Sequence, residues 1–174
     1  MSVYSEPVER DALVASLEGA DSVVILSCPF CASLALSYQR DLPAYRPTRR
    51  PSWMYGAMVE ANELKERLER EGKRVSLYGL NAWATPFCTP GRMKVRRVRA
   101  KCRGADAVVV MSCTGGLVGV SQMLGRSSKV IHGMRSVGCG TFTLRFKPPF
   151  DIAIVREATR VSRFNASSGR CEPD

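Results

Sequence analysis

Two segments of the chain share a layout that strongly constrains its fold. In each, an apolar, β-branched run ends at a serine and a cysteine, and a stretch of small residues follows. The segments are VVILSCPFCASLAL at residues 23–36 and AVVVMSCTGGLVGV at residues 107–120. Each layout predicts a buried strand that passes directly into a helix. Strands that alternate with helices form mainly parallel sheets, so the two segments together predict an α/β fold.

The rest of the chain continues this alternation. We expect helices over residues 7–20, 31–42, 56–72, 91–104 and 116–125, and five strands over residues 21–28, 73–80, 106–113, 129–134 and 141–146. Residues 41–55 hold three prolines and predict an irregular loop, and residues 135–140 predict a glycine-rich loop. We expect one cysteine-rich domain over residues 1–150 and a partly irregular extension over residues 151–174.

The bulk composition favours a soluble protein. An apolar content of 45% in 174 residues is enough for the core of one domain. The polar, acidic amino terminus does not resemble a secretory signal. The uncharged run over residues 107–124 is long enough to suggest a membrane span, but its glycines and hydroxyl side chains favour a strand, a turn and a packed helix. We therefore expect a cytoplasmic protein without a membrane partner.

Seven cysteines and a single histidine restrict the chemistry. Without an export signal, the cysteines are expected to be reduced thiols, metal ligands or redox groups. The histidine, His132, lies at the end of an expected strand and is expected to be structural. Cys102 precedes a strand and Cys171 lies in the tail, so neither is expected to bind a metal. Ligands of parallel sheets bind beyond the carboxyl ends of the strands, and the cysteines that should gather there are Cys28, Cys31, Cys88, Cys113 and Cys139.

Converging thiols are consistent with several kinds of site. Thiolates at helix amino termini are stabilised by the helix dipole, and they are soft ligands that suit zinc or an iron–sulfur cluster. A structural zinc site usually has two CxxC pairs, whereas this chain has one, Cys28 and Cys31. That pair also resembles a thioredoxin-type motif, and a third interpretation treats the thiols as small core residues. The glycines of CTGGLVG match a phosphate-binding loop imperfectly, and they favour a backbone that passes close to a cluster or to a neighbouring strand instead.

The chain carries a formal net charge of +10, much of it in residues 93–103, with a second cluster at residues 46–51. Such clusters are typical of a solvated helix face, of a surface for an acidic protein or of a nucleic-acid interface. No aromatic side chains alternate with the arginines of residues 93–103, which argues against stacking on single strands. We expect Val95 and Val98 to face the sheet and the cations of this helix to face solvent.

The order of the segments resembles the C-terminal domain of bacterial and archaeal methylenetetrahydrofolate reductases, which in acetogens is also a small separate partner subunit. The resemblance covers about residues 10–145 and is carried by VVILSCPFCAS, ELKERLEREGKRV, the solitary Cys88, ADAVVVMSCTGGLVGV and KVIHGMRSVGCGTF. The stretch ASLALSYQRD, the proline–arginine loop at residues 43–51 and the few tail cysteines depart from the family pattern.

The resemblance implies a Rossmann-like three-layer sandwich that carries a 4Fe-4S cluster, or zinc in its place. It implies Cys28, Cys31, Cys88 and Cys113 as ligands, with Cys139 as a further candidate. It also implies an accessory subunit that transfers electrons or supports assembly beside a flavin- or folate-type reductase, rather than an enzyme acting alone. The alternative function is that of a CxxC thiol–disulfide redox enzyme, and an acidic electron carrier is an alternative partner. Nucleic acid is the less favoured partner.

Overall fold

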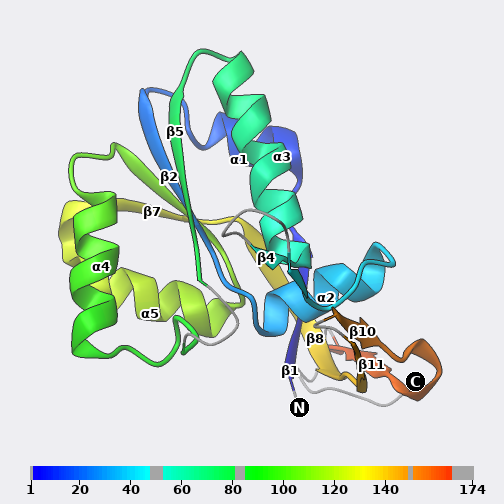
Figure 1. The fold of residues 1–174 in the computed structure, drawn as a ribbon. Coiled ribbons are helices and arrows are strands. Elements are labelled where there is room, and N and C mark those ends of the chain that lie inside the picture. Colours follow the sequence, from blue (N-terminus) through cyan, green and yellow to red (C-terminus); the bar gives the residue numbers. More distant parts are fainter. Residues whose placement is uncertain (1, 48–52, 81–84, 149–150, 166–174) are drawn as a thin grey trace.

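The centre of the protein is a four-stranded parallel sheet (Figure 1). The computed structural model describes residues 2–47, 53–80, 85–148 and 151–165. The strands of the parallel sheet, in spatial order, are β5 (Arg74–Gly79), β2 (Ser22–Ser27), β6 (Ala107–Met111) and β7 (Lys129–His132). The two segments with the strand-to-helix layout thus supply the two central strands, and the predicted α/β class is confirmed.

Alternate side chains of the central strands enter two separate hydrophobic cores. In β2, Val23 and Ile25 belong to one core, and Val24 and Leu26 belong to the other. Successive side chains of a strand point to opposite faces, so a continuous apolar strand needs a cover on both. One core is closed by α1 (Arg10–Ala15), α2 (Cys31–Gln39) and α3 (Gly56–Arg70), and the other by α4 (Arg92–Cys102) and α5 (Thr114–Leu124).

A second, antiparallel sheet lies beside α2 and was not expected from the sequence. Its order is β1 (Ser2–Pro7), β8 (Met134–Thr141) and β11 (Arg160–Arg163). Gly138 of β8 allows the close approach of β11, because a Cβ there would lie 2.1 Å from the Ser162 carbonyl oxygen. The remaining elements are two strand pairs and two short 3₁₀ helices: β3 (Arg46–Pro47) with β4 (Trp53–Met54), β9 (Leu144–Lys147) with β10 (Asp151–Ile154), η1 (Gly125–Ser127) and η2 (Arg156–Ala158).

Two predictions about the carboxyl-terminal third are wrong. The parallel sheet has four strands among the described residues, not five, because the expected strand at residues 141–146 contributes instead to β8 and to the antiparallel pair of β9 and β10. The expected glycine-rich loop at residues 135–140 is part of β8. Its glycines serve the close contact with β11 rather than a turn.

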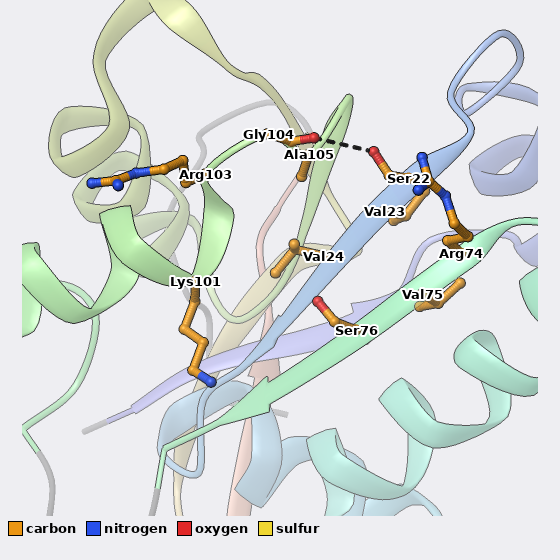
Figure 2. Close-up of a pocket in the computed structure, with 10 residues that line it drawn as sticks. All are labelled: Ser22, Val23, Val24, Arg74, Val75, Ser76, Lys101, Arg103, Gly104 and Ala105. Atoms are coloured by element: carbon orange, nitrogen blue, oxygen red, sulfur yellow. Dashed lines mark hydrogen bonds between the residues drawn. The ribbon is translucent and has the colours of Figure 1, made fainter.

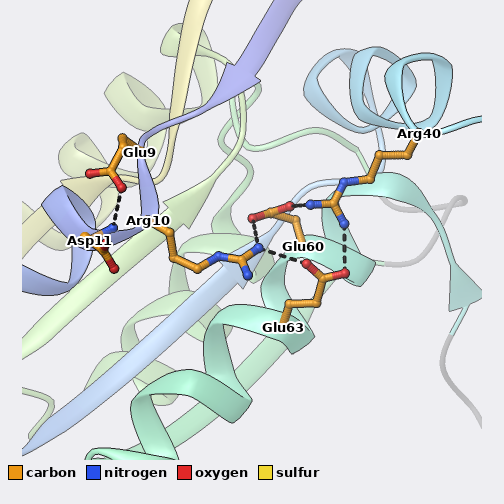
Figure 3. A network of polar contacts seen from close by, with 6 residues as sticks. All are labelled: Glu9, Arg10, Asp11, Arg40, Glu60 and Glu63. Atoms are coloured by element: carbon orange, nitrogen blue, oxygen red, sulfur yellow. Dashed lines mark hydrogen bonds and ion pairs between the residues drawn. The ribbon is translucent and has the colours of Figure 1, made fainter.

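Helix α3 is held by contacts from α1 and α2. The buried Glu60 and its neighbour Glu63 each form ion pairs with both Arg10 and Arg40 (Figure 3). Two serine hydroxyls of α2 accept hydrogen bonds from the first N–H groups of α3, which therefore needs no cap of its own. The position of α2, and of its first residue Cys31, thus depends on side chains of two other helices.

We predict that Glu60→Gln lowers the free energy of unfolding by roughly 2 kcal/mol. The Glu60 side chain is only 6% exposed, whereas the side chains of Arg10 and Arg40 are 40% and 31% exposed. Water can therefore solvate the two arginines when they lose the Glu60 carboxylate, which limits the loss of stability. Urea denaturation measures this change. The matched control is Glu69→Gln on the exposed face of the same helix, where the pair with Lys65 should contribute less than about 0.5 kcal/mol. Equal effects of the two changes would contradict the structural role of the network.

Candidate functional site

Four of the five predicted site cysteines lie beyond the carboxyl ends of three neighbouring strands. Cys28 follows β2, and Cys31 is the first residue of α2. Cys88 lies in the loop between β5 and α4, and Cys113 precedes the first residue of α5. The loops meet at one edge of the sheet because the three strands are parallel and adjacent.

Cys31 and Cys113 form the closest thiol pair of the site. Cys113 donates a hydrogen bond to the Cys31 sulfur, and this bond lowers the pKa of Cys31 to about 5, against an opposing effect of burial. The Val3 N–H and the Ser2 hydroxyl add to the lowering of that pKa. The same bond, followed by burial, raises the pKa of Cys113. Of the two thiols, Cys31 is therefore the more acidic.

Cys28 is the most deeply placed thiol of the group. Its residue is 5% exposed, and burial raises its pKa to about 11, although N–H groups of Phe87 and Phe30 act in the opposite direction. Negative charge on Cys31 and Cys88 raises this pKa further. A nearby cation would offset the repulsion among them.

Cys88 is exposed, and its position is fixed by the residue before it. The Phe87 ring is fully buried in the core beneath α4 and α5. A Cβ at Gly119 of α5 would lie 2.2 Å from the Phe87 carbonyl oxygen, so only glycine lets the loop cross the helix so closely. A Cβ at Gly115 would lie 3.5 Å from the Cys88 Cβ and 3.9 Å from the Cys113 sulfur. Gly115 therefore leaves space between these two cysteines.

The first turn of α4 brings one cation to the thiols. Lys94 donates hydrogen bonds to the carbonyl oxygens of Pro86 and Thr89, on either side of Cys88. Burial lowers the pKa of Lys94, whereas negative charge on Cys28 and Cys88 raises it. Lys94 therefore both holds the Cys88 loop and supplies positive charge to the site.

Sequence reasoning missed the groups that surround the thiols. Ser2 and Val3 come from β1, which the sequence did not predict as a strand. Tyr55 donates a hydrogen bond of 2.8 Å to the Leu80 carbonyl and one of 3.4 Å to the Ser27 carbonyl, so it ties the ends of β5 and β2 together beside Cys28. Only the glycines of CTGGLVG carried a signal in the sequence. Gly119 does allow a close backbone approach, but its neighbour is the loop at Phe87 rather than a cluster or a strand.

The remaining cysteines and the histidine have different surroundings. Cys139 lies within β8 rather than in the expected loop, paired with Val3 and Ser162, and it is disulfide-bonded, unlike the free Cys28, Cys31, Cys88 and Cys113. Cys102 is buried at the last residue of α4, at the opposite end of the sheet, and burial raises its pKa to about 11. His132 shares a hydrogen bond of 2.9 Å with the Ser112 carbonyl oxygen, which is a structural contact. Cys171 lies outside the described residues.

Within the described ranges, no group of three or more His, Cys, Asp or Glu side chains is placed to hold a metal ion. A hollow of about 260 Å³ lies at the other end of the sheet, between β5 and the end of α4 (Figure 2). It is lined by Arg74, Lys101 and Arg103 and contains no cysteine. The described helices include none that is long and apolar enough to cross a membrane.

Comparison of the chain with family models, with curated proteins and with solved structures finds no match.

We predict that Cys31 of the metal-free protein reacts with iodoacetamide at a rate that levels off above about pH 6, because its thiolate is already formed there. Mass spectrometry of the alkylated peptides measures this rate. Cys113→Ala removes the S–H donor, so the pKa of Cys31 should rise and its rate at pH 6 should fall. Cys102→Ala should leave the rate unchanged. An unchanged rate in Cys113→Ala would show that the pair does not stabilise the thiolate.

We predict that Gly119→Ala lowers the free energy of unfolding by about 1–3 kcal/mol, because the new Cβ displaces the backbone at Phe87. Urea denaturation measures the loss, and hydrogen exchange should rise over residues 85–91. Gly91→Ala is the matched control, since a Cβ there meets nothing within 4 Å. Its effect should stay within about 0.5 kcal/mol. If both variants behave alike, the loop does not depend on Gly119.

Proposed function

We propose that Cys28, Cys31, Cys88 and Cys113 bind a 4Fe-4S cluster, with zinc as the alternative metal. We further propose that the protein is an accessory subunit of a one-carbon redox system that resembles methylenetetrahydrofolate reductase, and that it acts in the cytoplasm. We also propose that its α/β fold is Rossmann-like. The observation that carries it is the convergence of four thiols from separate loops at one edge of the sheet. An all-sulfur donor set suits soft metals and clusters.

The groups around the sulfurs favour negative charge on them. Backbone N–H groups of Phe30, Phe87 and Val3 favour negative charge on Cys28 and Cys31. Hydrogen bonds to cluster sulfurs and burial are the means by which a protein sets a reduction potential. Gly115 leaves space between Cys88 and Cys113, and Lys94 supplies a compensating cation. A bound cluster would supply one-electron transfer, and the exposed Cys88 would be the side nearest to a partner.

A second candidate function rests on the Cys31 thiolate. Its pKa of about 5 and its place at the start of α2 are features of attacking thiols in disulfide exchange. Cys31 would attack a partner disulfide and release one thiolate, and Cys28 would then displace the second, which leaves a Cys28–Cys31 disulfide and a reduced partner. The high pKa of Cys28 disfavours the second step.

We predict that protein purified without oxygen contains about four iron and four sulfide per chain. Cys113→Ser should lose most of the metal, because a hydroxyl is a poor ligand for soft metals. Cys102→Ala is the control and should retain it, since Cys102 lies at the far end of α4. Metal and sulfide analysis, with absorption spectra, provides the measurement.

The outcomes separate the two candidates. Zinc without sulfide, lost in Cys113→Ser, would assign the alternative metal to the same four cysteines. Metal-free protein with a titratable Cys28–Cys31 disulfide would overturn the cluster and favour thiol exchange. Equal metal loss in Cys102→Ala and Cys113→Ser would show that the loss reflects folding rather than ligation.

A further inference from the structure

The positive charge of the protein is concentrated in one part of the chain. Between Glu71 and Asp151 the sequence contains a single carboxylate, Asp106. That carboxylate is occupied by the N–H groups of Asp21 and Ser22 and by the Ser22 hydroxyl. This part of the chain includes α4 and α5, which cover one face of the parallel sheet.

Helix α4 carries most of this charge. Six of its eleven residues are Arg or Lys, and Arg103 follows directly. Within the described part of the chain, none of these cations forms an ion pair with a carboxylate. On the opposite side of the sheet, by contrast, two of the three cations of α3 form ion pairs: Lys65 with Glu69, and Arg67 with Glu71 and Asp11. The net charge of the protein does not explain why the cations of α4 lack carboxylate partners in the described part of the chain and two of those of α3 have them. The difference lies in where the carboxylates are placed.

The exposed face of α4 also has an apolar centre. Met93 is 72% exposed, and with Arg96, Arg97 and Ala100 it lines a shallow hollow of about 360 Å³. These residues lie on one face because side chains three or four positions apart are neighbours on a helix. At the other end of α4 the basic surface continues into the hollow lined by Lys101, Arg103 and Arg74 (Figure 2).

We propose that this face of α4 is a docking surface for an acidic protein with an apolar side chain at the centre of its contact. Met and Arg are enriched in protein interfaces, and an apolar centre within a charged rim is their usual arrangement. A nucleic-acid backbone would use the cations but not Met93, and α4 has no aromatic side chain on which bases could stack. This inference states the chemical character of the partner that the proposed accessory role requires. It rests on the proposed function only for the reason why the partner binds.

The position of the surface connects it with the cysteines. Lys94, in the first turn of α4, holds the loop that carries Cys88. A protein seated on Met93 would therefore lie next to the exposed thiol of the site. Long-range attraction between opposite charges would also speed its arrival and would weaken as salt screens it.

The test uses three labelled probes and fluorescence anisotropy at low and physiological salt. The probes are a peptide of Glu-Glu-Leu repeats, a peptide of equal charge made of Glu-Glu-Ser repeats, and duplex DNA. Arg96→Glu with Arg97→Glu should weaken binding of the leucine peptide by at least about tenfold. The control is Arg145→Glu with Lys147→Glu on the exposed strand β9, which changes the net charge equally and should weaken it by no more than about twofold. Met93→Ser should weaken the leucine peptide and leave the serine peptide unchanged.

Three results would overturn the proposal: equal weakening by the two charge-reversal pairs, no effect of Met93→Ser, or DNA that binds more tightly than the leucine peptide and depends on Arg96 and Arg97. If the protein self-associates and the Arg96→Glu, Arg97→Glu variant does not, the proposal would also be overturned, because the occupant of this surface would then be a second copy of the chain. The Cys113→Ser protein separates this inference from the proposed function. It should bind the leucine peptide as the unmodified protein does, whether or not a metal is present.

Discussion

The parallel arrangement of β5, β2 and β6 is the constraint on which the rest of the protein depends. The central strands are apolar on both faces and need helices above and below. Each strand must then be followed by a connection that leaves the sheet at the same edge. All the loops that leave the central strands therefore meet in one place, and a short side chain at the start of each loop suffices to build a site there. Cys28 directly follows β2, Cys31 and Cys113 lie where α2 and α5 begin, and Cys88 lies further along the loop after β5.

Close backbone approach makes this edge more compact than parallel strands alone require. Gly56 lets α3 press against the backbone of α2, and Gly119 lets the Cys88 loop cross α5. The Tyr55 hydroxyl joins the ends of two strands at the same level. Each contact removes a degree of freedom from a loop that carries a thiol. Packing thus holds the loops of the site in place. Hydrogen bonds and charge then set the pKa values of its thiols relative to one another.

The sequence predicted those parts of the fold whose signals are local. The helical periodicity of residues 56–70 and the apolar runs at β2 and β6 define their elements without reference to distant residues, and the parallel rule then brings Cys28, Cys31, Cys88 and Cys113 to one edge. Cys139 was misplaced because glycine-rich segments read as loops, whereas β8 needs its glycines for contact with β11. β1 was missed because a register shift between Tyr4 and Ser5 places both side chains inward and removes the alternation typical of a strand. The polar groups around the thiols come from distant segments, and no local pattern identifies them.

The pairing of β1 with β8 joins residues 2–7 to residues 134–141, nearly the full length of the described chain. The groups of β1 that act on the Cys31 sulfur are far from β8 in the sequence, yet they are fixed only when β8 has formed beside them. Contacts of such long sequence separation form late in folding because closing a long loop costs entropy first. We therefore expect the edge of the parallel sheet to form before β1 takes its place beside Cys31. Until β1 and β8 pair, the Cys31 sulfur lacks the Ser2 and Val3 groups that lower its pKa.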